Sequence, residues 1–348
     1  MTAILDDQDA TNHRPVVPRL TLAQGSGGQL SDDLFISCIL PRLGNRVLND
    51  LLDSAILPGA DRIALTIDSC VVQPLKFPGG DIGRLAVCGA VNDLAVCGAK
   101  PLGLALSLIL SEGLERSVLE EVLDSIAATG AEAGVRVVTG DTKVIPRGLG
   151  AGLCISTAGV GAAGPPEVHP GAIRPGDLVL ISGTIADHGL AVLLARDMPH
   201  LRSAVRSDVA PLNGMIHRLL DEVAGVVFLR DPSSGGLAGV VVDIAARTGL
   251  HVTLYEKDIP ILPHTRHAAD MLGIDPLEVA NEGKVVVVVR PEAVDNVLDA
   301  LRADKYGKDT QIIGVVGTEP DGVCDLRTEI GGSRILQKPY GEQLMRIG

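Results

Sequence analysis

Residues 77–110 read FPGGDIGRLAVCGAVNDLAVCGAKPLGLALSLIL, and they contain the patterns of a turn, a helix and a strand in succession. The Pro-Gly-Gly turn comes directly before Asp81, where a helix of small apolar side chains is expected to begin and to run to Ala99. Leu102–Leu110 is a nearly unbroken apolar run of strand length, which is typical of a buried strand. This order predicts helices packed against a sheet.

The same alternation continues on both sides of this stretch. Arg62–Ile67 has the pattern of a strand, and the apolar residues of Leu114–Ala133 recur at helical spacing. Further strands are expected at Val135–Thr139 and Gly150–Val160. Residues 164–171, GPPEVHPG, are rich in Pro and Gly and predict a linker between two domains.

The second half of the chain repeats the mixture of strands and helices. Strands are expected at Leu178–Ser182, Val226–Leu229, Val252–Tyr255, Val285–Arg290 and Ile312–Gly317, and helices at Asp187–Arg196, Asp208–Val223, Gly236–Thr248, Pro263–Leu272 and Ala293–Ala303. The pattern therefore predicts an α+β fold with two domains, 20–163 and 172–329. Residues 1–19 are mostly polar, and we expect a flexible tail there, whereas residues 330–348 are expected to form a C-terminal tail.

The composition argues against several classes of function. The 348-residue chain carries a net charge of −13 and shows no basic patch for nucleic acid, and its aromatic share of 2% leaves no stacking platform for bases. No run of about 18 apolar residues predicts a membrane span. The six cysteines form no C-x-x-C pair, which favours reduced thiols in the cytoplasm.

Four acidic residues stand where apolar segments end or continue. Asp53, Asp68 and Asp141 follow apolar stretches, and Asp93 lies inside an apolar helix pattern. The chain has no Walker A loop, so a bound nucleotide would need another device, and carboxylates that hold Mg²⁺ are the clearest one. We favour a metal–phosphate cluster of these four residues, although each one alone also fits a capping or turn role.

Glycine-rich turns precede two of the expected helices. Gln24–Gly28 includes Gly27 and Gly28, and the turn before Asp81 includes Gly79 and Gly80. Helix N-termini expose backbone N–H groups that favour anions, although a plain flexible turn explains each motif as well. In the second half, His188 follows another such turn, and we expect it to be structural.

Two further charged residues are candidates for chemistry. Lys143 lies two residues after Asp141, where its ammonium group would stabilise a transferring phosphoryl group or simply pair with Asp141. Glu282 precedes the apolar run Val285–Val289, where its carboxylate would act as a general base or serve as an ordinary turn residue. The local sequence leaves both alternatives open.

Taken together, these segments resemble the HypE family of hydrogenase maturation proteins, within the superfamily typified by aminoimidazole ribonucleotide synthetase. The resemblance runs from about Leu20 to the C-terminal tail. The matching segments are FPGGDIG (77–83), VNDLA (91–95), GAKP (98–101), TGDTKV (139–144), GT (183–184), DHG (187–189), SDVAPLN (207–213), RDP (230–232), ANEGK (280–284) and GEQL (341–344).

The resemblance implies a fold, cofactors and site residues. It implies an N-terminal domain that dimerises through its sheet, an α+β C-terminal domain beside it, and ATP with Mg²⁺ in the cleft. It assigns the metal and phosphate to Asp53, Asp68, Asp93 and Asp141. It further assigns cofactor binding to Gly27, Gly28, Asp81, Asn92, Asp141 and Thr142, and catalysis to Lys143, Glu282 and Asp93.

The implied reaction is the ATP-dependent dehydration of a primary carboxamide. Phosphoryl transfer turns the amide oxygen into a good leaving group, and loss of phosphate with the N–H protons gives a nitrile or thiocyanate. In this family the amide is a carbamoyl group on a C-terminal cysteine, and the product supplies cyanide to the iron of nickel–iron hydrogenase. The implied partners are a HypF-type carbamoyltransferase and HypC- and HypD-type proteins.

The sequence departs from the family pattern at three positions. The family tail ends in Pro-Arg-Ile-Cys, whereas this tail has Met345 and Gly348 at the first and last of these positions, and Ser234 stands where the family usually has Arg. Three hypotheses therefore remain: a divergent enzyme that acts on a free or carrier-bound amide, a maturation protein that is inactive or uses a thiol from elsewhere, and a non-catalytic nucleotide-binding scaffold. We favour dehydratase chemistry, with the identity of the amide left open.

Overall fold

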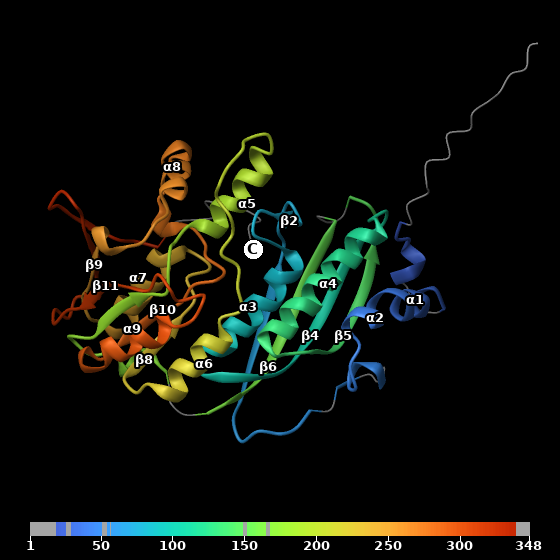
Figure 1. Ribbon diagram of the computed structural model, residues 1–348, viewed down its shortest axis with the longest axis horizontal. Coiled ribbons are helices and arrows are strands. Elements are labelled where there is room, and N and C mark those ends of the chain that lie inside the picture. The colour runs from blue at the N-terminus through green and yellow to red at the C-terminus, as the bar shows by residue number, and fades with distance from the viewer. Residues whose placement is uncertain are drawn as a thin grey trace, which may run out of the picture.

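The computed structural model describes residues 19–25, 29–50, 54–55, 57–148, 152–164 and 168–338. It contains two main sheets that lie side by side (Figure 1), with strand orders β1-β6-β4-β5 and β13-β12-β9-β11-β7-β10-β8. Helices α3 (Ile82–Val96) and α6 (Asn213–Glu222) contact each other at the junction between the two halves. The two sheets with flanking helices agree with the predicted α+β fold.

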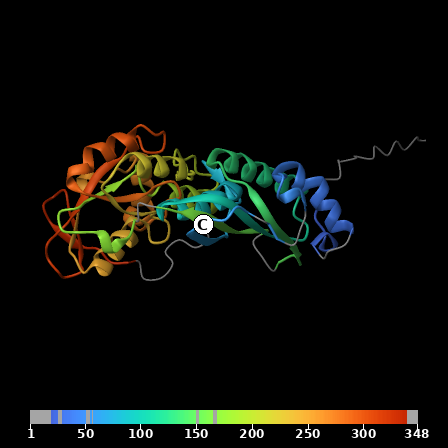
Figure 2. The same cartoon turned by 90° about the horizontal axis from the view of Figure 1, so that it is seen from below.

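The first sheet is covered by helices on one face. Its strands are β1 (Ile63–Cys70), β4 (Ala99–Ser111), β5 (Val137–Ile145) and β6 (Leu153–Ala163), and only β4 and β5 run parallel. Helices α3 and α4 (Arg116–Ala133) pack on the face formed by Leu104, Leu106 and Leu108. Figure 2 shows the green helix α4 on one side of this sheet.

The opposite face of the first sheet carries exposed apolar side chains. In β1, alternate residues point to opposite faces, and Ile63, Leu65 and Ile67 are 62%, 74% and 75% exposed. Ile109 of β4, which lies beyond β6 in the same sheet, is exposed as well. Within the described ranges no helix covers these side chains, and a continuous apolar surface of this kind usually marks an interaction face.

The second sheet is covered on both faces. In β10 (Val286–Val289) all four valines are fully buried. Val286 and Val288 pack with α7 (Gly236–Thr248), whereas Val287 and Val289 pack with α6 and α9 (Val294–Arg302). The remaining strands are β7 (Leu178–Ile181), β8 (Val226–Arg230), β9 (Val252–Tyr255), β11 (Gln311–Val316), β12 (Cys324–Arg327) and β13 (Ser333–Ile335).

Shorter elements complete the two halves. Helices α5 (Asp187–Asp197) and α8 (Pro263–Leu272) pack together beside the second sheet. A small hairpin of β2 (Lys76–Phe77) and β3 (Gly80–Asp81) leads into α3. At the N-terminal side lie η1 (Leu22–Gly25), α1 (Gln29–Leu34), η2 (Phe35–Ile39), α2 (Leu40–Leu43) and η3 (Leu48–Asp50), and the second half adds η4 (Pro170–Ala172), η5 (Glu256–Asp258), η6 (Pro276–Glu278) and η7 (Pro291–Ala293).

Two strands are longer than the sequence predicted. We expected the first strand to end before Asp68, but β1 continues to Cys70 because Asp68 and Ser69 pair with Thr157 and Ser156 of β6. We also expected a strand to end at Thr139, but β5 continues to Ile145 alongside β4. We interpreted polar residues as strand ends, but backbone pairing with the neighbouring strands continues past these residues.

The predicted start of one helix and the predicted extent of the C-terminal tail were wrong. Helix α6 begins at Asn213 and not at Asp208, because Pro211 and the segment before it run in an irregular conformation against the N-terminal half. Part of the predicted tail 330–348 is strand β13, which pairs with β12. Neither of these two strands was predicted from the sequence. Of the predicted tail 1–19, residues 1–18 lie outside the described residues, and Arg19 bridges to Glu115.

Several polar contacts join the two halves at their junction. Arg84 of α3 donates to the carbonyl oxygen of Val209 at 2.9 Å and to the Glu132 carboxylate at 2.9 Å. Glu132 also accepts from Lys305 at 2.7 Å and from the hydroxyl of Tyr306. These cations and the hydroxyl hold the pKa of Glu132 down at about 2, although burial opposes them.

The sequence predicted neither a disulfide nor a membrane-spanning helix. All six cysteines are free, so the chain contains no disulfide. Among the described residues, no helix combines the length and the apolar character that a membrane span requires.

Candidate active site

Helix α3 begins at the predicted Gly-rich turn and organises one side of the site. Asp81 caps the helix, because its Oδ1 accepts the backbone N–H of Arg84 at 2.9 Å. Asp81, which we predicted to bind the cofactor, therefore serves as the N-cap of α3.

Asp68 and Asp93 lie together between β1 and α3. The Asp93 Oδ2 accepts a hydrogen bond from the hydroxyl of Thr66 at 2.6 Å, and Thr66 and Asp68 point to the same face of β1. Asp68 approaches the helix at Gly89, where an added Cβ would lie 2.1 Å from the Asp68 Oδ2. Glycine at position 89 therefore gives the Asp68 carboxylate its space beside α3.

The second half contributes three more carboxylates to the same region. Strands β8 and β10 are antiparallel neighbours, with Arg230 opposite Val286, so Asp231 after β8 and Glu282 before β10 lie at one edge of the sheet. Asp208 also contacts this loop, because its Oδ1 accepts the backbone N–H of Glu282 at 3.2 Å. We call Asp68, Asp93, Asp208, Asp231 and Glu282 the acidic cluster.

The pKa values show that these carboxylates act on one another. Burial raises the pKa of Glu282 well above its usual range, and the charges of Asp231, Asp68, Asp208 and Asp93 raise it further. Burial, opposed in part by the Thr66 hydrogen bond and reinforced by Asp231 and Asp68, raises the pKa of Asp93 to about 6. The cluster therefore favours protons or cations.

A buried ion pair and a buried histidine support the loop around Glu282. Lys284 Nζ lies 3.1 Å from Asp208 Oδ2, and both side chains are largely buried. The His188 ring lies 2.8 Å from the Ser207 hydroxyl and packs edge-on against Phe77. Its complete burial agrees with the predicted structural role.

The side chain of Asn92 lies between the two halves of the protein. Its Nδ2 donates to the carbonyl oxygens of Ala210 at 3.0 Å and Glu282 at 3.4 Å, and its Oδ1 accepts from the Leu212 N–H at 2.7 Å. We predicted that Asn92 binds the cofactor, but these three contacts occupy its amide group.

Lys143, Asp141 and Thr142 lie within β5, away from the acidic cluster. Lys143 Nζ pairs with Asp141 Oδ1 at 3.1 Å, and both side chains are exposed. The register places Asp141 opposite Ser107 of β4 and therefore on the uncovered face, whereas Asp68 points to the helical face of the sheet. Of the predicted metal-binding residues Asp53, Asp68, Asp93 and Asp141, a single chain therefore brings Asp68 and Asp93 together and places Asp141 on the opposite face of the sheet.

Three of the predicted residues cannot be placed, and the predicted metal site is not preformed. Asp53, Gly27 and Gly28 lie outside the described residues. In the described part of the chain, no group of three His, Cys, Asp or Glu side chains is arranged to hold a metal ion. The oxygen donors of the acidic cluster, together with the raised pKa values of Asp93, Asp231 and Glu282, still fit a hard divalent cation, provided that a ligand supplies further oxygens.

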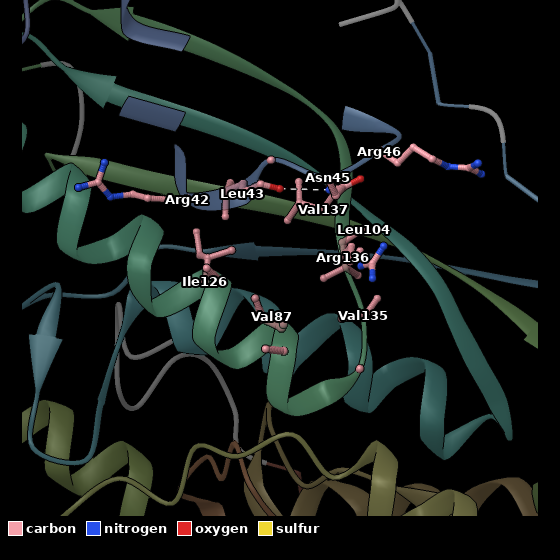
Figure 3. A pocket seen from close by; sticks show the side chains of 15 residues that line it. Arg42, Leu43, Asn45, Arg46, Val87, Leu104, Ile126, Val135, Arg136 and Val137 are labelled. Carbon is pink, nitrogen blue, oxygen red and sulfur yellow. Dashed lines mark hydrogen bonds between the residues drawn. The ribbon is translucent and has the colours of Figure 1, made fainter. Parts of the chain in front are cut away.

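A cavity of about 560 Å³ lies elsewhere, between α4, the end of α2 and the start of β5 (Figure 3). Arg42, Arg46 and Arg136 line it, but their guanidinium groups point away from one another. Arg42 also pairs with Glu120 and Asp124. The cavity contains none of the predicted site residues, and its cations do not converge on one point.

Four residues near the site had no role predicted from the sequence, namely Thr66, Asp208, Asp231 and Lys284. Asp231 had the same signal as the predicted acids, because it directly follows an apolar strand. Asp208 and Lys284 carried only weak signals, since their pairing joins segments 76 residues apart. Their contribution depends on tertiary contacts.

Removal of the Asp93 charge is expected to stabilise the metal-free protein. The folded pKa of about 6 lies above the unfolded value of 3.8, so ionisation destabilises the fold above about pH 6, and this penalty disappears as the pH falls towards 4. Asp93→Asn should therefore raise the free energy of unfolding by about 1–3 kcal/mol near pH 8. Thermal denaturation in a chelator would measure this, and an equal gain at pH 8 and pH 4 would contradict the explanation.

Comparisons with known proteins agree with this architecture. The family model for the AIR synthase related protein N-terminal domain matches residues 52–163, and the model for the C-terminal domain of the same family matches residues 174–327. Together they cover the strands of both sheets up to β12 and the loops that carry the acidic cluster.

Individual relatives give a closer assignment. Carbamoyl dehydratase HypE of Escherichia coli K12 is 43% identical over 336 residues, which are 94% of this chain and 99% of the relative. A crystal structure of the hydrogenase maturation protein HypE in complex with ATP has a TM-score of 0.90 and 39% identity, covering 94% of this chain and 99% of that chain. A crystal structure of a HypE–HypF complex has a TM-score of 0.76 and 41% identity, covering 90% and 100%.

These matches extend over nearly the whole chain and include both domains and the segments that carry the predicted site. Their identities lie well above the level at which only the fold is shared. The chain therefore belongs to the AIR synthase related protein family, among the HypE carbamoyl dehydratases.

Proposed function

We propose that this protein is an ATP-dependent carbamoyl dehydratase, which converts a primary carboxamide to a nitrile or thiocyanate in the cytoplasm during hydrogenase maturation. The observation that supports this most directly is the position of Glu282, half-buried among acidic residues that come from both halves of the protein. A carboxylate with a raised pKa at such a junction is suited to proton transfer.

The overall reaction conserves atoms and charge. The amide oxygen attacks the γ-phosphorus of ATP, ADP leaves, and the carbon then carries a phosphate leaving group. Cleavage of the C–O bond with loss of both N–H protons gives the C≡N bond, inorganic phosphate and ADP. Glu282, in its ionised form, is the group that we assign to accept an N–H proton.

The proposed ATP site uses residues from the predicted set. Asp68 and Asp93 would hold Mg²⁺, whose charge would offset the phosphate oxygens of ATP when it is bound. We keep the predicted glycines Gly27 and Gly28, and Asp53, as candidates for nucleotide or metal contacts. A HypE structure that contains ATP supports the choice of nucleotide.

In a homodimer, residues of β5 would lie at the interface between the two copies. The exposed side chains of Ile63, Leu65 and Ile67 form an apolar face that a second copy would cover. Asp141, Lys143 and Thr142 belong to the same sheet, and the first two share that face. We therefore propose that Lys143 and Asp141 act at the dimer interface, where they would contact phosphate.

The HypF-type carbamoyltransferase is the partner that we propose first, since a similar HypE forms a complex with HypF. HypC- and HypD-type proteins are proposed as further partners. Gly348 favours a second candidate function, because it stands where the family has the cysteine that carries the carbamoyl group. In that case the enzyme would act on a free or carrier-bound carboxamide.

An assay of the purified protein with Mg-ATP distinguishes the two functions. We expect phosphate release to rise when the amide substrate is supplied, and mass spectrometry should then show a product that lacks one water. A response to a panel of free carboxamides would support the free-substrate enzyme. A response only for Gly348→Cys with a HypF-type carbamoyltransferase would support the maturation role, and no response in either assay would contradict dehydratase activity.

A further inference from the structure

We propose that Asn92 is a positioning residue that sets the place of Glu282 relative to Asp93. The inference rests on the proposed function, because it assigns a purpose to the distance between these two carboxylates. It follows from the contacts of one buried amide group that joins α3 to the loop before β10.

The Asn92 side chain is 3% exposed and uses both ends of its amide. Its Nδ2 bridges the carbonyl oxygens of Ala210 and Glu282, and its Oδ1 accepts the Leu212 N–H at 2.7 Å. An amide is the uncharged side chain that can donate twice and accept at the same place. Aspartate has a similar shape but would turn a carboxylate towards two carbonyl oxygens.

The backbone of Glu282 is held from its other side as well. Its N–H donates to Asp208 Oδ1 at 3.2 Å, and its carbonyl oxygen accepts from the Ala210 N–H at 3.3 Å. At the next residue, Gly283, an added Cβ would lie 1.8 Å from the Asp208 carbonyl oxygen, so the two segments are in close contact. The Lys284–Asp208 ion pair fixes this loop further.

Asn92 and Asp93 are consecutive residues of α3, so their side chains project about 100° apart around the helix. Asp93 turns to Thr66 of β1, while Asn92 turns to the second half of the protein. One rigid helix thus holds the first carboxylate directly and the second through the Asn92 amide. Loss of the amide should let the Glu282 loop move against α3 without moving Asp93.

The chain offers a matched control in Asn213. Its side chain is 5% exposed, and its Nδ2 donates across the same junction to the Ala133 carbonyl oxygen at 2.7 Å. Among the described residues, the Asn213 side chain makes no hydrogen bond to the acidic cluster, so its removal disturbs the junction without touching Glu282. Asn213→Ala and Asn92→Ala each remove one buried amide between the two halves.

The first experiment compares the steady-state kinetics of Asn92→Ala, Asn92→Asp and Asn213→Ala, with ADP release measured on the amide that the unmodified protein dehydrates. We expect both Asn92 variants to lower kcat by roughly 10²-fold, with KM for ATP within about three-fold. Asn213→Ala should lower the melting temperature less than Asn92→Ala, because it removes one hydrogen bond and not three, and it should keep kcat. Equal loss of kcat in Asn92→Ala and Asn213→Ala, or no loss in either, would overturn the inference.

Hydrogen exchange tests the same inference without turnover. Asn92→Ala should increase exchange at 208–212 and 281–284, whereas Asn213→Ala should leave both segments as protected as in the unmodified protein. Unchanged exchange at 281–284 in Asn92→Ala would overturn the positioning role. An unmodified protein that dehydrates no amide would contradict the proposed function, and the exchange result would still decide whether Asn92 holds the loop.

Discussion

Glu282→Gln is expected to slow dehydration by about 10²–10⁴-fold, since that is the usual contribution of a positioned general base. Glutamine preserves the length of the side chain but cannot accept the N–H proton. The backbone contacts of residue 282 do not involve its side chain, so the loop should keep its conformation. Steady-state ADP release with the amide substrate would measure the loss of turnover. Calorimetry would measure whether the variant still binds ATP.

Glu132→Gln is a suitable control for this prediction. Glu132 is another carboxylate at the junction, but it pairs with Arg84 and Lys305 and lies outside the acidic cluster. We expect the control to lose stability and to retain turnover. A Glu282→Gln protein that dehydrates its amide at the normal rate would show that another group takes the proton.

Leu65→Asp combined with Ile67→Asp is expected to give a monomer without measurable dehydratase activity. Two new carboxylates on the uncovered face of β1 would have to be buried against the second copy, and burial of unpaired charge is strongly unfavourable. The fold itself should persist, because both side chains are about three-quarters exposed in the single chain. Light scattering and the same assay of ADP release would test the two consequences.

Met271→Asp provides the matched control for the dimer prediction. Met271 is also an exposed apolar residue, but it lies on α8 beside the second sheet. This variant should keep the oligomeric state and the activity of the unmodified protein. If the β1 double variant is a fully active monomer, then Lys143 and Asp141 have no role that depends on a second copy.

Much of the fold could be predicted from the sequence because apolar periodicity fixes buried elements. The helices Gly236–Thr248 and Pro263–Leu272 and the strand Val252–Tyr255 have the predicted bounds. Strand ends were less predictable, as Asp68 shows: a polar residue ends a strand only if the neighbouring strand also ends there. The pairing of Asp68 with Thr157 is a long-range property that no local pattern reveals.

The candidate site was predictable in its residue types and less so in its arrangement. Asp93 and Glu282 belong to one acidic cluster, because the charge of Asp93 contributes to the raised pKa of Glu282. The position of Asp141 depends on the register between β4 and β5, and a shift of one residue would turn it to the other face. Asn92 had the polarity of a ligand-binding residue, but its amide is used by three backbone groups.

The central claim is that the oxygen of the amide leaves as phosphate, and an oxygen-18 label on that oxygen tests it most directly. The carboxamide, free or attached to Gly348→Cys, is labelled and incubated with Mg-ATP and the protein, and the released phosphate is analysed by mass spectrometry. The proposed dehydration predicts one labelled oxygen in each phosphate formed together with a nitrile or thiocyanate. Unlabelled phosphate, with the label still in the amide or released to water, would contradict it.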